Sequence, residues 1–151
     1  MINRLSIVDQ TISVTIPAGD RFAVATAVAL PEQLRGRFVY GFYVKWRHNY
    51  FTAGGTFPEI FCVYPAMGFS GGEDLAGGNA IYQPFTLSVE PREVAGSGVN
   101  NVQLRAGIQG ILTADLVVTA DITIFYSNTS LGRVYPIDLQ NMLISQSLVN
   151  G

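Results

Sequence analysis

A period of two in hydrophobicity recurs along this chain and limits its fold more than any other feature. In residues 11–16 the even positions are Ile or Val and the odd positions are Thr or Ser. The same alternation returns in residues 102–108 and 112–126, whereas a period of 3.6 is almost absent. Because successive side chains of a strand point to opposite faces of a sheet, this pattern predicts strands with one buried face and one wet face.

Residues 22–30 predict a strand that is apolar on both faces. Ala occupies every odd position, and the even positions carry large apolar residues apart from Thr26. Alanine is a poor strand former. Its repetition on one side therefore indicates a need for small size, where another layer of backbone or another subunit comes close.

Residues 112–126 predict an unusually long strand, because one face stays apolar over all of them and ordinary strands have about 3–10 residues. Gln109 and Gly110, which follow the alternating stretch 102–108, favour a hairpin between the two strands. We expect the long strand either to bend through a bulge or to project toward a neighbour.

Aromatic, Gly and Pro residues divide the middle of the chain. Residues 37–47 carry an aromatic stripe and predict a central core strand. Residues 56–64 predict a further strand, and the Gly-rich stretch 65–80 predicts a long irregular loop. Residues 81–90 predict a strand at a sheet edge or a bulge, because Pro84 cannot donate to a ladder.

About eight short strands with Gly- and Pro-rich turns predict an all-β fold. We expect residues 1–136 to form a single-domain antiparallel β-sandwich of the jelly-roll type. Residues 137–151 break the alternation and predict a C-terminal arm or short helix that packs on the domain or on a neighbour.

Charged residues make up 13% of the chain, against about 25% in an ordinary soluble domain. The exterior must then consist of neutral polar groups and backbone, or be covered by partners. The formal charge is −2 and the nine basic residues are scattered, so we expect no nucleic-acid partner. No apolar stretch approaches the roughly 20 residues of a membrane span. The N-terminus also lacks the apolar core of a signal peptide, which predicts synthesis and folding in a cytoplasm.

His48 is the sole histidine and Cys62 the sole cysteine. Nucleophilic triads need an imidazole with local partners, and zinc or iron sites need several His or Cys ligands. No phosphate-binding glycine motif stands between a strand and a helix. We therefore expect no enzyme, with no catalytic residue, no cofactor and no metal, and we interpret Cys62 as a small buried hydrophobe.

Two enzyme-like or ionic alternatives stay open beside this expectation. The loop 71–79 holds two carboxylates and an amide that Ca²⁺ could use, although solvated turn residues are favoured there. Glu59, Glu90 and Glu93 could supply a glycosidase pair, but solvated turns again are the default for such residues.

The Gly-rich loop is the candidate binding site, because long loops on rigid sheets are where binding is usually placed. Its candidate residues are Phe69, Glu73, Asp74 and Asn79. The alternative function that this loop supports is a carbohydrate-binding, lectin- or adhesin-like β-sandwich. Two or more coplanar aromatic rings exposed on one face would favour that alternative.

The strands 11–16, 22–30 and 112–126 with the apolar tail resemble small all-β phage virion proteins of the jelly-roll capsid decoration, or cement, type. The resemblance implies a non-enzymatic virion protein, made in the host cytoplasm, that forms homo-oligomers, with a trimer favoured. It implies other virion proteins as partners, such as the major capsid protein, with loops and arms bridging coat subunits. We expect these interface residues: Ala23, Ala25, Ala27, Ala29, Ile137, Leu139, Met142, Leu143, Ile144 and Leu148.

Overall fold

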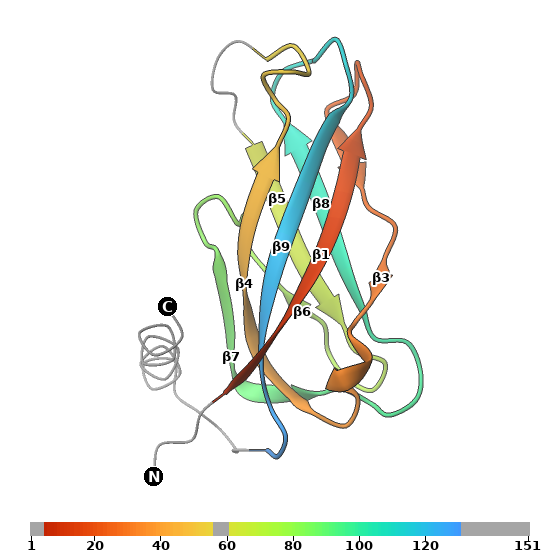
Figure 1. The fold of residues 1–151 in the computed structure, drawn as a ribbon, viewed down its shortest axis with the longest axis vertical. Helices are drawn as coiled ribbons and strands as arrows, with labels where there is room; N and C mark the ends of the chain where they lie inside the picture. Colours follow the sequence, from red (N-terminus) through yellow and green to blue (C-terminus); the bar gives the residue numbers. More distant parts are fainter. Residues whose placement is uncertain (1–4, 56–60, 131–151) are drawn as a thin grey trace.

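The computed structural model describes residues 5–55 and 61–130 and folds them into two β-sheets packed face to face (Figure 1). The all-β sandwich expected from the alternation is thereby confirmed. The elements are β1 (Ser6–Ile16), β2 (Phe22–Val24), β3 (Val28–Ala29), a 3-10 turn (Glu32–Leu34), β4 (Phe38–His48), β5 (Phe61–Gly68), β6 (Leu75–Ala76), β7 (Phe85–Glu93), β8 (Asn101–Ile108) and β9 (Leu116–Ser127).

Sheet A has the strand order β1-β9-β4-β7, and sheet B has the order β2-β8-β5-β6, with the short β3 also paired to β8. Every pairing is antiparallel. The chain crosses between the sheets repeatedly, and its first and last strands lie side by side in sheet A (Figure 1). This is the strand order of a jelly roll.

The main core lies between the sheets and is made by alternate residues of each strand. A second, smaller buried cluster of Leu5, Tyr40 and Phe125 is separate from it. In the pairing of β1 with β9, Ile12 lies opposite Ala120 and Val14 opposite Val118, and all four are buried. The residues between them in β1, such as Thr11, face outward. Burying one such aliphatic side chain stabilises the fold by about 1.5–3 kcal/mol, so the period of two is a direct record of the core.

The stretch 22–30 is not one strand, contrary to the expectation. It forms β2 and β3, and the intervening residues 25–27 lie outside both strands. Its two apolar sides do not both face protein. Ala23 and Ala25 pack against the core, while Phe22 and Val24 are exposed. The small residues face inward because Ala23 lies opposite the buried Ala106 of β8.

The predicted hairpin at Gln109 and Gly110 is wrong. β8 belongs to sheet B and β9 to sheet A, so the segment between them passes from one sheet to the other. β9 begins at Leu116, and Leu112 is buried in the connection. The apolar alternation of residues 112–126 includes both the connection and β9, because the connection also covers the end of the core. The predicted strand over residues 112–126 is therefore too long at its N-terminal end.

β5 runs through Pro65, where the sequence predicted an irregular loop, and β6 lies in the same Gly-rich stretch. The proline fits because its carbonyl accepts a hydrogen bond from Gly77 N–H, just beyond the end of β6 at Ala76. The missing N–H therefore falls at the end of that ladder. The prediction of an interior strand at β4 is confirmed. The strand expected over residues 81–90 is β7, which is an edge strand as predicted but spans Phe85–Glu93, so Pro84 lies before it and not inside it.

Gly41 allows β7 to lie against β4. The register of β4 shifts between Val39 and Gly41 against both of its neighbours. A Cβ at Gly41 would overlap the carbonyl oxygen of Thr86 and come within 2.9 Å of Leu87 Cδ2. A β-bulge at an interior strand thus depends on one residue without a side chain.

We predict that Gly41→Ala lowers the free energy of unfolding by about 1–3 kcal/mol, because the backbone of β7 must move away from β4. Chemical denaturation followed by tryptophan fluorescence measures this change. Gly71→Ala is the matched control, since a Cβ there meets open space. Equal stabilities of the two variants would contradict the prediction.

Candidate assembly surface

The outer face of sheet B carries an exposed apolar patch. Phe22 lies opposite Gly107 and Val24 opposite Arg105 in the pairing of β2 with β8. On the other side of β8, Cys62 lies opposite Gly107 and Tyr64 opposite Arg105. Phe22 is 52%, Val24 57% and Tyr64 41% exposed. We call these residues and the half-buried Cys62, with Arg105 among them, the outer patch.

Gly107 lets the outer patch close around the sole cysteine. A Cβ at Gly107 would lie 2.7 Å from Cys62 Sγ and 3.4 Å from Phe22 Cδ2. Burial raises the pKa of the Cys62 thiol, and a hydrogen bond with the Gly107 backbone offsets part of that rise. Cys62 is therefore a protonated thiol at neutral pH, packed at the surface rather than in the core as the sequence suggested.

The alanines of residues 22–30 are not together on this patch. Ala23 and Ala25 are half-buried against the core, and Ala27 and Ala29 are exposed. Their role as interface residues stays a prediction. The predicted tail residues, Ile137 to Leu148, lie outside the described residues. Sequence reasoning missed Phe22 and Val24 as surface residues because large apolar residues normally face the core. The available signal was the pair Ala106 and Gly107 in β8. The small Ala106 faces inward opposite Ala23, and Gly107 leaves space on the outer face for Phe22.

Around Asp121, the outer face of sheet A is polar and its side chains hydrogen-bond to one another. Thr11 Oγ1 donates to Asp121 Oδ1 at 3.0 Å, and Arg47 Nε donates to Asp121 Oδ2 at 3.2 Å. The hydroxyls of Ser13 and Thr119 lie 2.8 Å apart. Sheet A also carries exposed apolar side chains, with Ile7 46%, Phe85 51% and Val117 37% exposed. Apolar surface therefore remains on both sheets.

We predict that Asp121→Asn removes a small, pH-dependent contribution to stability. The hydrogen bond from Arg47 holds the pKa of Asp121 below its ordinary value, which is about 3.9. A lowered folded-state pKa stabilises the protein above the ordinary pKa, and this contribution is lost as the pH falls through the lower value. The pair is solvent-exposed, so the loss at pH 7 should stay below about 1 kcal/mol.

Urea denaturation of both proteins from pH 7 to pH 2 measures the effect. The difference between wild type and Asp121→Asn should shrink below about pH 4, where the wild-type carboxylate also becomes neutral. Asp20→Asn serves as an exposed control. A difference that persists unchanged at pH 2 would contradict the electrostatic origin.

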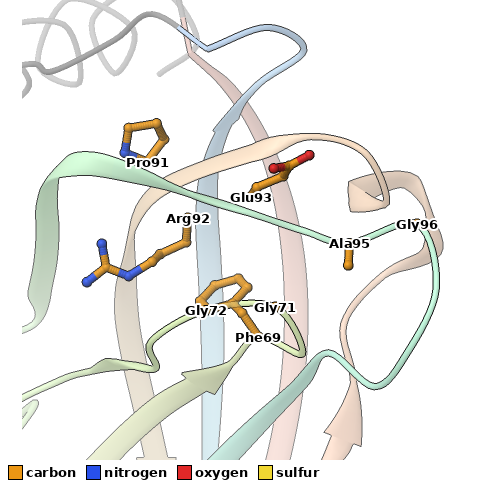
Figure 2. Close-up of a pocket in the computed structure, with 8 residues that line it drawn as sticks. All are labelled: Phe69, Gly71, Gly72, Pro91, Arg92, Glu93, Ala95 and Gly96. Carbon is orange, nitrogen blue, oxygen red and sulfur yellow. The ribbon is translucent and has the colours of Figure 1, made fainter.

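The Gly-rich loop does not gather the four candidate binding residues. A cavity of about 370 Å³ lies between this loop and the end of β7, and of the four only Phe69 lines it (Figure 2). Glu73 and Asp74 are exposed beside β6. Asn79 has a structural role, because its Oδ1 accepts from Val63 N–H and its Nδ2 donates to the carbonyl of Phe61.

The cavity itself offers little to a ligand. Arg92 is its only cationic residue, and one of its terminal nitrogens already donates to Ser88 Oγ and to the carbonyl of Glu90. Phe69 is its only aromatic ring and is buried. Its lining residues are Phe69, Gly71, Gly72, Pro91, Arg92, Glu93, Ala95 and Gly96.

Two aromatic pairs that include an exposed ring have tilted or edge-to-face geometry. Tyr43 and Phe85 are in contact on sheet A, with ring planes inclined by 46°. Tyr50 and Phe51 meet edge to face, at 70°. Carbohydrate binding by exposed aromatic rings stays an alternative prediction.

His48 is held by packing and by its own turn. Its ring stacks against Trp46 and Phe61, with centroid distances of 5.1 and 5.2 Å. Its Nδ1 accepts a hydrogen bond from Tyr50 N–H at 3.0 Å. No group of three His, Cys, Asp or Glu residues that could hold a metal ion occurs within the two described ranges. No helix in that part of the chain is long and apolar enough to cross a membrane.

No protein-family model matches this chain, and no curated protein matches it in sequence. Among solved structures it is similar to the capsid of cyanophage Pam1, with 13% identity and a TM-score of 0.40 over 81% of this chain and 86% of that chain. It is also similar to the capsid of Helicobacter pylori bacteriophage KHP30, with 13% identity and a TM-score of 0.31 over 87% and 99% of the two chains.

A third match is a virus-like particle of human norovirus GI.7, with 11% identity and a TM-score of 0.35 over 89% of this chain and 33% of that chain. The matches are thus to phage and virus capsid proteins, the class that the strand pattern resembles. Because every TM-score lies below 0.5, the likeness carries no argument about partner or activity.

Proposed function

We propose that this protein is a non-enzymatic structural component of a virus particle, a capsid decoration or cement protein. In this proposal it forms a homo-oligomer, with a trimer favoured, and bridges coat subunits. The observation that carries the proposal is the outer patch, where Phe22, Val24 and Tyr64 are exposed on one sheet face. Contiguous apolar surface on a soluble domain marks an interaction site.

The contrast between the two sheet faces gives the proposal a direction. Around Asp121, sheet A holds its polar groups in mutual hydrogen bonds, as Thr11 and Arg47 do with that carboxylate. The outer patch combines aromatic, aliphatic and arginine side chains, the residue types enriched at protein interfaces. We infer that the outer face of sheet B faces the coat. The resemblance of the strand pattern and tail to small virion proteins supports the location in a particle.

We predict that Tyr64→Ser weakens binding to empty coat-protein shells of the parent virus at least tenfold, since a central interface tyrosine commonly contributes 2 kcal/mol or more. Co-sedimentation with the shells measures the affinity. Tyr82→Ser is the matched control, because Tyr82 is 73% exposed and lies before β7, outside sheet B.

Alkylation of Cys62 reports on the same surface without a mutation. The thiol should react slowly in the free protein, because its pKa is raised by burial, and should become fully protected on the shells. Unchanged binding of Tyr64→Ser together with unchanged alkylation on the shells would overturn the proposal for sheet B.

The tail 137–151 is proposed to act as a bridging arm, since it carries seven apolar residues in a stretch without the strand pattern. A chain truncated after Pro136 should remain soluble and lose most of its binding to the shells. Circular dichroism and thermal melting control for folding. If the truncated protein binds at full strength, the arm has no part in attachment.

A further inference from the structure

Sheet B ends at β2 with backbone groups that face away from the sheet. Ile108 N–H donates to the carbonyl of Arg21, and Ala25 N–H donates to the carbonyl of Leu104. In an antiparallel pair, residues alternate between bonding to the partner strand and pointing away from it. Since Arg21 and Ala25 bond to β8, the N–H and C=O of Phe22 and Val24 point to the open edge.

The opposite edge of sheet B, at β6, has the same property. Gly77 N–H donates to the carbonyl of Pro65, and Ala76 lies opposite Ala66 in the pairing with β5. The alternation then directs the N–H and C=O of Ala76 away from β5, together with the C=O of Asp74, which immediately precedes the strand. Both Asp74 and Ala76 are exposed, whereas Leu75 between them is buried in the core.

The β2 edge is short, with three residues, but it carries no charge, proline or bulge. Charges, prolines and bulges normally guard an edge, and the edge strand β7 of sheet A has all three, including Glu90 and Pro91. β2 is Phe-Ala-Val, with two exposed apolar side chains. An edge of this kind is suited to accept another strand.

The two edges of sheet B also differ in charge. Arg105 stands on the outer face in β8, beside Val24 of the edge strand. Glu73 and Asp74 stand at the start of β6, on the opposite side of the sheet. The ion pairs of residues 5–55 and 61–130 are Arg35–Glu32 and Arg47–Asp121, so none of these three charges is neutralised by a pair there.

We propose that a second copy of this chain adds its β6 edge to the β2 edge, so that sheet B continues from one copy into the next. This inference rests on the proposed function and names the partner and the two edges for its oligomeric contact. The strands of sheet B alternate in direction, β2 and β6 being antiparallel. A neighbouring copy in the same orientation therefore presents β6 antiparallel to β2, which preserves the alternation.

Backbone geometry selects the register of this contact. Phe22 pairs with Ala76 of the second copy and Val24 pairs with Asp74 of the second copy, because these four residues have edge-directed backbone groups. Their side chains all lie on the outer face. Arg105 of one copy then lies two strands away from Asp74 of the second copy, with about 10 Å between their Cα atoms. Their side chains can meet over Val24, which lies between them.

A contact between two different edges is heterologous, so it repeats from copy to copy and closes into a ring when the rotation permits. The outer face of sheet B remains available to the coat in such a ring, because the edges and not the face join the copies. Phe22, Val24 and Arg105 belong to both contacts, whereas Tyr64 lies only on the outer patch and Asp74 and Ala76 lie only at the β6 edge. Tyr64 and the β6-edge residues can therefore be altered independently.

Charge reversal tests the pairing. Arg105→Glu and Asp74→Lys should each lower the self-association constant at least tenfold by sedimentation equilibrium, and the double variant should recover most of the loss. Glu90→Lys, an exposed reversal at the edge of sheet A, is the control. An effect of Arg105→Glu with none of Asp74→Lys would overturn the two-edge contact, as would failure of the double variant to recover.

Edge-blocking prolines give a second test that does not depend on charge. Val24→Pro and Ala76→Pro each remove an N–H that points away from the sheet, so the bonds within sheet B remain. Each variant alone should be monomeric, and an equimolar mixture should stop at dimers, because each dimer uses the one intact edge of each copy. Thermal melting checks that both variants fold.

Wild-type behaviour separates this inference from the proposed function. A wild-type protein that stays monomeric at high concentration but binds coat shells through Tyr64 would overturn the edge contact and leave the proposed function standing. A wild-type oligomer that responds to the edge variants as expected but does not bind coat shells would support the edge contact and overturn the proposed function.

Discussion

Every strand of this fold depends on a shared core that no pair of consecutive strands can make alone. β8 ends in sheet B and β9 begins in sheet A, and their inward residues meet across the core rather than along a ladder. Leu104 and Ile122, for example, are fully buried from opposite sheets. Both sheets therefore depend on an apolar residue at every second, inward-facing position of their strands. The outward-facing positions are free of this requirement and can serve in binding.

The class of fold could be predicted from the sequence because the alternation of apolar and polar residues directly reflects which positions face the core. The sequence also predicted β4 as an interior strand from an aromatic stripe and β7 as an edge strand from Pro84. Pairing was less accessible. A buried strand shows the same alternation whichever sheet it joins, so Gln109 and Gly110 suggested a hairpin where the chain crosses the sandwich.

The candidate surface was harder to predict than the fold. Apolar residues on both sides of a strand do not state which side faces water, and at β2 the large Phe22 and Val24 face outward while Ala23 faces the core. The assignment depends on Ala106 and Gly107 of β8, more than eighty residues away. The loop residues misled for a different reason, since Asn79 was read as a ligand-binding amide but bonds to the backbone of β5.

The pairing of β1 with β9 has a kinetic consequence. Ser6 lies opposite Tyr126, and Ile16 lies opposite Leu116, so the contacts of the first strand span most of the described chain. Pairings so distant in sequence make folding slow, because the chain must close a large loop before the contacts form. During synthesis, β1 has no ladder partner until β9 has left the ribosome, and the nascent chain must keep its apolar strands apart from those of other chains until then.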